Sequence, residues 1–375
     1  MDKSKLIAFF EDLHRHPELG YAEHRTTAKV REALTDAGVE LPDTGLSTGL
    51  IAVVRGARPG RVIGLRCDID ALPIQEESGL PYASQEPGRM HACGHDFHTA
   101  AMLGAALLLQ EGRSGLAGTV KIVFQPAEEV GTGGAKTVVA TGLLDDVEEF
   151  YALHTYPYFE PGTLGIKEGP VMAAPDHFTV TLRGRGAHAA YPHDAIDPVP
   201  AMAALIQAYQ TVVSRSVDPF DNAVVSVAHA EAGNTWNVIP ETAFLEGTVR
   251  SLDNAVRRLV RGRMEDITAS VAAAYGCEAE FCYAEGPDPV VNDAALCAAA
   301  RDVALRMGLR VDRQEDCMGG EDFSEYLKRC PGVFVRVGTG GHVASHHPAF
   351  TADPAALPSA AEYFAALARA RAEKI

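Results

Sequence analysis

The sequence predicts an α/β protein into which a second, α+β block is inserted. Short β-branched strands alternate with helical segments over the first half of the chain, a pattern typical of a sheet with helices on its faces. From about residue 176 the order changes to β-α-β-β-α-β, which is that of the ferredoxin-like split unit. The 375 residues are enough for two domains of about 100–200 residues each.

The elements of the first block follow from hydrophobic spacing. An amphipathic helix is expected from Thr26 to Val39, because Val30, Leu34 and Val39 fall close to one face and Gly38 lies near its end. The strands that follow are short, β-branched and bounded by Gly or Pro; they are expected at residues 49–54, 61–67, 119–124 and 150–154. Helical segments at 99–110 and 135–143 lie between them.

The inserted block is expected at residues 176–286, so that residues 1–175 and 287–375 form the first domain. Its expected elements are a strand at 177–184, a helix at 200–215, strands at 223–230 and 242–250, a helix at 255–275 and a strand at 278–283. The chain then returns with a helix near 293–307, a helix opening at 321–322, a strand at 333–337 and a last helix from Pro358. No internal repeat or low-complexity tract appears.

Composition and charge narrow the class of protein. Hydrophobic residues make up 47% and charged residues 22%, as in ordinary globular proteins. The net charge of −17 repels phosphate backbones and anionic lipid heads, so neither nucleic acid nor a membrane surface is an expected partner. The longest apolar stretch, Ala100 to Leu109, is too short to span a bilayer, and Leu6 to Phe10 is too short for a signal-peptide core. We therefore expect a cytoplasmic protein.

The seven cysteines form no regular pattern. An odd count in a chain without a signal segment argues for reduced thiols and against a disulfide framework. A cysteine with a special role would then be a metal ligand or a nucleophile.

The densest group of possible ligands is the segment Met90–His98. It holds three histidines, one cysteine and one aspartate directly before an apolar helix. Such side chains are costly to bury unpaired, so they require a metal, a hydrogen-bond network or solvent. A nucleophilic Cys93 activated by His95 is an alternative.

A hydrophobic strand ends at Phe124 and is followed by paired carboxylates, Glu128 and Glu129. Side chains at the carboxyl end of a strand in an α/β sheet open toward the crevice where ligands bind. Adjacent carboxylates suit a metal ligand beside a general base, and the alternative is a solvated acidic loop. The glycine-rich residues 131–134 lack the Gly-Lys-Ser/Thr ending of a phosphate loop, which argues against nucleotide binding.

Other strands end in polar groups as well. Asp68 and Asp70 follow the strand at 61–67, and His154 ends the strand at 150–154. Neighbouring strands that end in acid, acid and imidazole indicate a metal crevice. His346, in Ser345-His346-His347-Pro348 near the C-terminus, is a further candidate contributor.

Eight motifs, in order along nearly the whole chain, resemble those of the aminoacylase/carboxypeptidase family of dinuclear metallopeptidases. They are Cys93-Gly94-His95-Asp96, Pro126-Ala127-Glu128-Glu129, His154, Gly184-Arg185-Gly186-Ala187-His188-Ala189, Asn237-Val238-Ile239-Pro240, Gly247-Thr248-Val249-Arg250, Gly320-Glu321-Asp322-Phe323 and His346-His347-Pro348. More narrowly, they resemble the N-acyl-L-amino-acid amidohydrolase branch, with hippurate hydrolase and indole-acetyl-amino-acid hydrolases. The segment His14–Leu19, with Glu23 and Thr26, fits this branch too.

The resemblance implies two divalent metal ions per chain, held by five ligands: Cys93, His95, Glu129, His154 and His346. The cysteine stands where other members use a bridging aspartate. Glu128 would be the general base, and Asp70 resembles the acid that orients a metal-binding histidine from behind. Relatives usually keep the first of the two neighbouring histidines, so His347 is the weaker candidate.

The resemblance also implies a fold and an assembly. A catalytic α/β/α domain with a mixed sheet would carry the ferredoxin-like block as a lid and dimerisation domain. His188 would donate to the oxyanion in the partner subunit's active site, and the alternative is a turn histidine without a catalytic role. Asn237 would bind substrate. Arg250, at the end of a strand, would fork onto the substrate carboxylate, with a surface ion pair as the alternative. A homodimer or a dimer of dimers is expected.

The reaction so implied is hydrolysis of the amide bond of N-acyl amino acids to a carboxylic acid and a free amino acid, by a metal-activated water and a glutamate base. Thiolate and imidazole favour zinc, cobalt or nickel, whereas carboxylate-rich dinuclear sites accept manganese, so zinc or manganese is expected. Two alternatives remain open: a cysteine hydrolase that uses Cys93, and a metal-dependent binding protein without catalysis.

Overall fold

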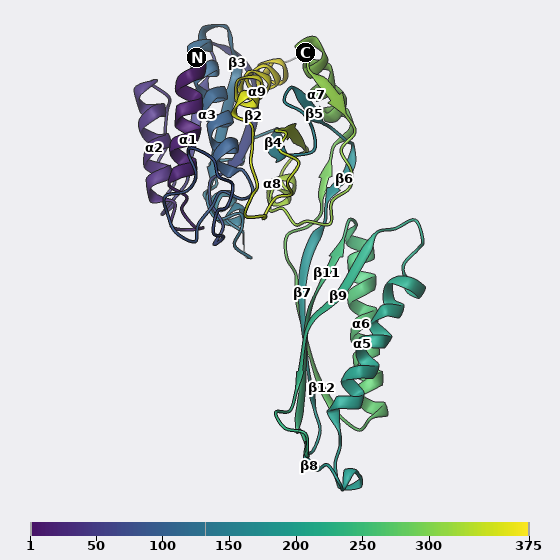
Figure 1. Cartoon of the computed structure of the whole chain (residues 1–375). Helices are drawn as coiled ribbons and strands as arrows, with labels where there is room; N and C mark the ends of the chain where they lie inside the picture. Colours follow the sequence, from purple (N-terminus) through teal and green to yellow (C-terminus); the bar gives the residue numbers. More distant parts are fainter. Residues whose placement is uncertain (1, 132, 374–375) are drawn as a thin grey trace. The chain divides into compact units, whose positions relative to one another are not determined.

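The computed structural model describes residues 2–131 and 133–373, and the chain divides into two compact units (Figure 1). Unit 1 consists of Met1–Val171, Val291–Glu315 and Asp322–Ile375, and unit 2 of Met172–Val290 and Asp316–Glu321. Each unit has its own hydrophobic core. The block expected at residues 176–286 falls within unit 2.

A seven-stranded mixed sheet forms the centre of unit 1. Its strand order is β1-β3-β2-β4-β15-β5-β14. The strands are β1 (Leu50–Arg55), β2 (Arg58–Asp68), β3 (Ala117–Gln125), β4 (Glu149–Tyr156), β5 (Thr163–Gly165), β14 (Arg310–Asp312) and β15 (Gly332–Gly338). Strands β3, β2, β4 and β15 run parallel to one another, whereas β1 and β5 are antiparallel to their partners β3 and β15. The carboxyl ends of β3, β2 and β4 therefore meet at one edge.

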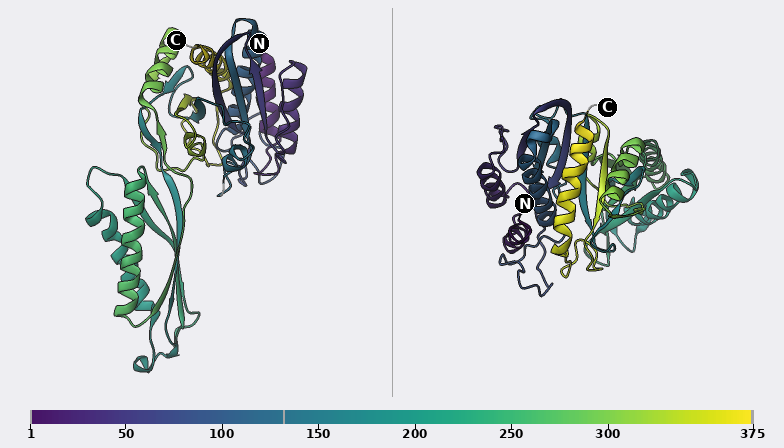
Figure 2. Two further views of the ribbon diagram at one scale, coloured as in Figure 1. Left: turned by 180° about the vertical axis from the view of Figure 1, so that it is seen from behind. Right: turned by 90° about the horizontal axis from the view of Figure 1, so that it is seen from above.

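Helices cover both faces of this sheet. They are α1 (Lys3–Arg15), α2 (His24–Asp36), α3 (His95–Glu111), α4 (Ala135–Val139), α7 (Ala294–Arg306), α8 (Ser324–Leu327) and α9 (Leu357–Ala372). Helices α3 and α9 lie side by side over β2 (Figure 2). Tyr151 and Leu153 of β4 face the core that these helices form. Phe150, one residue out of phase, points to the opposite face and packs on Tyr326 of α8, with ring centroids 4.9 Å apart.

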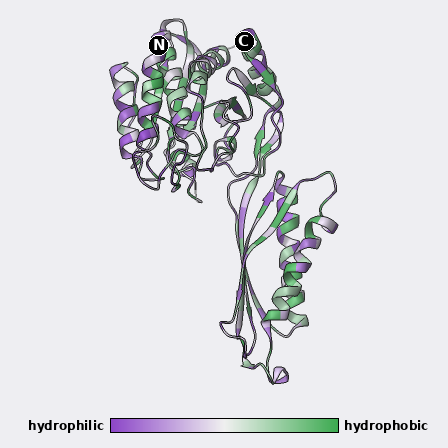
Figure 3. Cartoon of the chain, in the orientation of Figure 1, coloured by the Kyte–Doolittle hydropathy of each residue, from purple (hydrophilic) through white to green (hydrophobic). Residues whose placement is uncertain are grey.

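Unit 2 is a four-stranded antiparallel sheet with two helices on it. Its elements are β7 (Ala174–Arg183), β8 (Ala187–His188), α5 (Pro198–Ser216), β9 (Ala223–Ala232), β10 (Val238–Ile239), β11 (Thr242–Ser251), α6 (Asn254–Ala274) and β12 (Glu278–Ala284). The large sheet has the order β12-β7-β11-β9, and β8 pairs with β10. Figure 3 shows hydrophobic and hydrophilic stretches along both α5 and α6. Their apolar sides bury Leu205, Val212 and Val260 against the sheet, and the order β-α-β-β-α-β matches the expected split unit.

The short strands β6 (Gly169–Met172) and β13 (Val290–Asn292) pair in a separate two-stranded sheet. Among the described residues, no helix combines the length and apolarity needed to cross a bilayer.

Helices α1, α2, α3, α4 and α8 differ from the expectation drawn from the sequence. Helix α2 ends at Asp36, three residues before the expected end at Val39, and α8 begins at Ser324, after the expected opening at 321–322. Helix α1 was not expected, although Leu6, Phe10 and Leu13 are buried at helical spacing. Helix α4 ends at Val139, four residues before the expected end, and the Thr141 hydroxyl donates to the Val138 carbonyl just beyond it. Helix α3 begins at His95, four residues before the expected start, so part of the ligand-rich segment is helical.

Candidate metal centre

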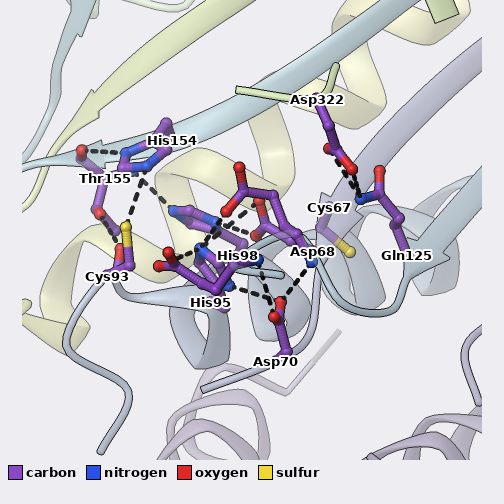
Figure 4. Close-up of polar contacts among 12 residues, drawn as sticks. Cys67, Asp68, Asp70, Cys93, His95, His98, Gln125, His154, Thr155 and Asp322 are labelled. Carbon is purple, nitrogen blue, oxygen red and sulfur yellow. Dashed lines mark hydrogen bonds and ion pairs between the residues drawn. The ribbon is translucent and has the colours of Figure 1, made fainter. Parts of the chain in front are cut away.

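Three adjacent parallel strands deliver polar side chains to one edge of the sheet (Figure 4). Asp68 is the last residue of β2, His154 lies in β4, and the segment with Glu128 and Glu129 follows β3. As the sequence predicts, these side chains lie at the same edge, because the register of the parallel strands brings their carboxyl ends together.

The start of α3 supplies the next candidate ligands. Gly94, at a φ of 84°, precedes His95, and a Cβ on Gly94 would lie 2.7 Å from the Thr155 side chain. The missing side chain lets the start of α3 approach β4 closely. His95 and His98 are three residues apart in the helix and fall on one face, with ring centroids 5.2 Å apart.

All five predicted metal ligands lie in overlapping groups whose ligand atoms are within 4.8 Å of one another. Three of these groups are Cys93–His95–His154, Cys93–Glu129–His346 and His95–Glu128–Glu129. Two further groups of possible ligands are Asp68–His95–His98 and Glu128–Glu321–Asp322. Cys93 belongs to both of the first two groups, the arrangement required of a ligand shared between two ions. Nitrogen, sulfur and carboxylate oxygen donors at these separations suit zinc or a similar divalent ion, whose ligand bonds are about 2.0–2.3 Å.

The surroundings of His95 fit a bound cation. Its Nδ1 lies 3.2 Å from Asp70 Oδ1. Its Nε2 is buried without a hydrogen-bond partner among the described residues, and carboxylate oxygens of Asp68, Glu129 and Glu128 lie 3.7, 3.9 and 4.0 Å away. These distances are too long for hydrogen bonds and leave room for an ion between the atoms. Burial opposes protonation, yet the negative field of Asp68 holds the pKa of His95 well above its usual value.

His154 presents one nitrogen toward Cys93. Its Nδ1 donates to the Thr155 carbonyl at 2.8 Å, which leaves the Nε2 lone pair 3.4 Å from Cys93 Sγ. Burial, and then repulsion by His98, lower the pKa of His154 well below its usual value, so the ring is neutral. Burial and the charge of Glu129 raise the pKa of Cys93 to about 12. A divalent cation would act in the opposite direction and favour the thiolate.

His98 belongs to the cluster but has no free lone pair. Its Nδ1 donates to Asp68 Oδ1 at 2.5 Å, and its Nε2 accepts from the Thr155 amide at 2.8 Å. Because both ring nitrogens are used within the protein, we expect His98 to support the site and not to bind an ion, although it forms a possible ligand group with Asp68 and His95. It fixes the backbone of Thr155, whose carbonyl in turn orients His154.

Asp70 and His346 complete the centre. The two Asp70 oxygens accept from the backbone amides of Glu128 and Glu129 at 3.1 and 3.0 Å, in addition to orienting His95. His346 Nε2 lies 3.1 Å from Glu129 Oε1, and its backbone amide donates to Ala92. The neighbouring His347 instead accepts the Ala349 amide on its Nδ1.

The three remaining predicted residues belong to unit 2. The pairing of β8 with β10 brings the segments of His188 and Asn237 together, and the Ala189 amide donates to the Asn237 carbonyl. The exposed His188 accepts the Ala190 amide on Nδ1 at 3.1 Å. Arg250 lies in β11, where its Nε donates to the Thr248 hydroxyl and burial lowers its pKa.

A buried network beneath the centre was not found from the sequence. Arg66, fully buried in β2, donates to Asp68, Gln125 and Asp322 at 2.7–2.9 Å. These bonds fix Asp68, which holds His98. An arginine inside the otherwise apolar strand at 61–67 is the signal that indicates such a network, because a buried guanidinium requires partners.

Comparison with known proteins identifies close relatives. An N-acetylcysteine deacetylase of Bacillus subtilis (strain 168) is 45% identical over 366 residues, which cover 97% of this chain and 96% of the relative. The N-acyl-L-amino acid amidohydrolase of Geobacillus stearothermophilus is 41% identical over 290 residues, covering 77% of this chain and 78% of the relative.

A solved structure has the same fold. The crystal structure of a dinuclear metal-binding peptidase of the M20 family from Bacillus subtilis matches with a TM-score of 0.90 and 42% identity, covering 100% of this chain and 99% of that one. The match in fold agrees with the predicted mixed α/β fold. The two metal ions named for that protein agree with the two groups of candidate ligands that share Cys93.

The model of peptidase family M20/M25/M40 matches residues 64–370. This match confirms the resemblance drawn from the eight motifs, and it contains every predicted metal ligand. Since it covers most of the sequence, the chain belongs to peptidase family M20/M25/M40.

Proposed function

We propose that this chain hydrolyses the amide bond of N-acyl amino acids, releasing a carboxylic acid and a free amino acid. The observation that carries the proposal is the convergence of five ligand-type side chains, from four separated segments, beside the carboxylate of Glu128. The names of the deacetylase and amidohydrolase relatives support this reaction class. A protein that only binds metal needs no base at this position.

Cys93, His95, Glu129, His154 and His346 would hold two divalent ions, zinc or manganese, with cobalt or nickel as alternatives. When bound, such ions make a water molecule more acidic and polarise the amide carbonyl. Asp70 would orient the ring of His95 through its contact with Nδ1. His98 would orient the ring of His154 indirectly, by holding the backbone of Thr155.

Glu128 would act as the general base. Its carboxylate lies 4.0 Å from His95 Nε2, at the edge of the ligand groups. It would take a proton from the attacking water, whose oxygen adds to the carbonyl carbon. It would then pass that proton to the leaving nitrogen as the C–N bond breaks.

We further propose that residues 176–286 act as a lid and dimerisation domain on the catalytic domain of residues 1–175 and 287–375. His188 accepts the Ala190 amide on Nδ1, so its neutral ring carries a proton on Nε2 and can donate it to an oxyanion in the partner subunit. Arg250 would bind the substrate carboxylate and Asn237 the rest of the substrate.

A cysteine hydrolase is disfavoured by the same geometry. Burial and the charge of Glu129 raise the pKa of Cys93 to about 12, although the nearby His95 acts in the opposite direction. A nucleophilic cysteine needs a lowered pKa. Without a cation, this thiol is a poor nucleophile.

The test is an assay of N-acetyl, N-benzoyl and longer N-acyl amino acids with added manganese or zinc, before and after chelation. We expect activity that chelation removes and metal restores. Activity that survives chelation but is lost to thiol alkylation would establish the cysteine hydrolase instead.

A further inference from the structure

The turn that carries Glu128 and Glu129 has an unusual backbone. Ala127, directly before them, has a φ of 53°, in the left-handed region that residues with a Cβ rarely adopt. Such a conformation persists only where the surroundings enforce it, and it often marks a functional site. The surroundings of Ala127 therefore decide how the paired carboxylates are presented.

Two buried carboxylates hold three successive amides of this turn. The Ala127 amide donates to Glu23 Oε1 at 2.7 Å, and the Glu128 and Glu129 amides donate to Asp70 at 3.1 and 3.0 Å. On the other side of Ala127, its carbonyl accepts the Gly134 amide at 2.8 Å. The peptide groups on both sides of the left-handed residue are thus fixed.

Glu23 lies at the start of helix α2. It occupies the N-cap position of α2, yet its side chain makes no capping bond there. Glu18 performs that task instead, accepting the amides of Arg25 and Thr26 at 2.9 and 2.7 Å. Glu23 has no exposed surface, and its carboxylate reaches a segment 104 residues away.

The chain before α2 also follows the turn closely. A Cβ on Gly20 would lie 2.5 Å from Val130 Cγ2 and 3.1 Å from Ala127 Cα. A glycine at this position lets the backbone around residue 20 pack directly on the turn. Contact on this side keeps Glu23 within reach of the Ala127 amide.

We propose that Glu23 is a positioning residue, whose hydrogen bond to the Ala127 amide holds the left-handed turn that aims the Glu128 carboxylate. This inference rests on the proposed role of Glu128 as general base. Asp70 holds the amides of both Glu128 and Glu129, but Glu128 directly follows Ala127, so the loss of Glu23 should disturb the base more than the metal ligand. A displacement of about 1 Å is enough to slow such a reaction roughly a hundredfold.

The test compares variants of the full-length, metal-loaded protein. Glu23→Ala and Glu23→Met remove the acceptor, and the methionine keeps the volume in case the alanine variant does not fold. Glu23→Gln retains an acceptor oxygen and removes the charge. Glu18→Ala is the matched control, because it weakens the start of α2 without touching Ala127.

The measurements are kcat, KM, metal content and hydrogen–deuterium exchange of the peptide that contains Ala127. In the acceptor-less variants we expect kcat to fall roughly 10- to 100-fold with KM and metal content nearly unchanged. Exchange at the Ala127 amide should become roughly tenfold faster or more. Glu23→Gln should restore protection and most of kcat, and Glu18→Ala should leave both near wild type.

Three results would overturn the proposal: kcat within threefold of wild type in Glu23→Met, an equal loss in Glu23→Gln, or metal loss in proportion to activity. Failure of the proposed function would look different. If the wild-type protein had no amidohydrolase activity, kcat and KM could not be compared. Faster exchange at the Ala127 amide in Glu23→Met, and protection of that amide in Glu23→Gln, would still test the hydrogen bond itself.

Discussion

Glu128 and Glu129 are neighbours in the chain but have different surroundings. Glu129 lies 3.1 Å from His346 and shares a ligand group with Cys93. Burial opposes its ionisation, but His346 and His95 lower its pKa, which favours the charged form that a metal ligand requires. Glu128 approaches His95 Nε2 at 4.0 Å and is not in either of the groups that contain Cys93. The difference predicts separable roles.

Replacing Glu128 by Gln or Ala should abolish turnover, with a loss of at least 10²–10⁴-fold, while metal content stays near wild type. Glu129→Ala should lose metal. Kinetics and elemental analysis of the same preparations measure both effects. If both variants keep activity within about tenfold, or roughly 1.4 kcal/mol in the barrier, the carboxylates form a solvated loop.

His14 illustrates a buried charge outside the ligand set. Its Nδ1 lies 2.6 Å from Asp96 and its Nε2 lies 3.1 Å from Glu76, so both ring nitrogens face carboxylates. Burial opposes protonation, but these carboxylates raise the pKa of His14 to about 9. The imidazolium links α1 to the start of α3 and to the loop around residue 76.

A folded-state pKa of about 9 against an ordinary 6.5 means that protonated His14 stabilises the fold, fully below pH 6.5 and progressively less as the pH rises toward 9. The contribution is on the order of 3 kcal/mol. His14→Gln should therefore lower the thermal midpoint much more at pH 6 than at pH 9.5, in matched metal concentrations. An equal loss at the two pH values would contradict the charged state of His14.

At the scale of elements, the sequence predicts which edge of the sheet carries the polar side chains. It does not predict the long-range hydrogen bonds that hold those side chains in place. Hydrophobic runs that end in Asp68 and His154 mark the edge from the sequence alone, and the family motifs add the ligands. Local spacing cannot show that Arg66 bonds to Asp322, 256 residues away, or that Glu23 bonds to Ala127. These pairs exist only once the sheet has brought distant segments together.

The sequence also predicts the ends of helices less accurately than their presence. The start of α3 was expected at residue 99 because its apolar run begins there, but the polar residues from His95 onward form its first turn. Helix α1 is not marked by a long apolar run, because its apolar residues Leu6, Phe10 and Leu13 are spaced along one face and are buried as in an amphipathic helix.

The start of α3 is testable through its glycine. Gly94→Ala should lower stability and metal content, because its Cβ would meet Thr155 at 2.7 Å and its φ is positive. Gly88→Ala is the matched control: Gly88 also has a positive φ of 74°, but a Cβ there has nothing within 4 Å. The control should cost about 1 kcal/mol and keep its metal. Equal effects of the two substitutions would show that the close contact with Thr155 is unimportant.

At the scale of the whole molecule, the proposed reaction uses residues of both units. Cys93, Glu128 and the other ligand-group residues belong to unit 1, and His188 and Arg250 belong to unit 2. If His188 acts in the partner's site, each active site requires two chains. A mixture of two inactive variants then tests the assembly.

Mixing inactive His188→Ala with inactive Glu128→Ala and letting subunits exchange should restore up to about a quarter of wild-type activity. About half of the dimers are then mixed, and each mixed dimer has one site with both the base and the oxyanion donor intact. Steady-state rates before and after exchange measure the recovery. No recovery, with exchange confirmed by a tag pulldown, would place His188 in its own subunit's site or outside catalysis.

The number of metal ions bound per chain tests the proposed dinuclear centre most directly. The five proposed ligands, in two groups that share Cys93, exceed what one tetrahedral site uses. Elemental analysis of active protein, prepared without chelator and saturated with manganese or zinc, should approach two ions per chain. A value near one in fully active protein would contradict the dinuclear centre.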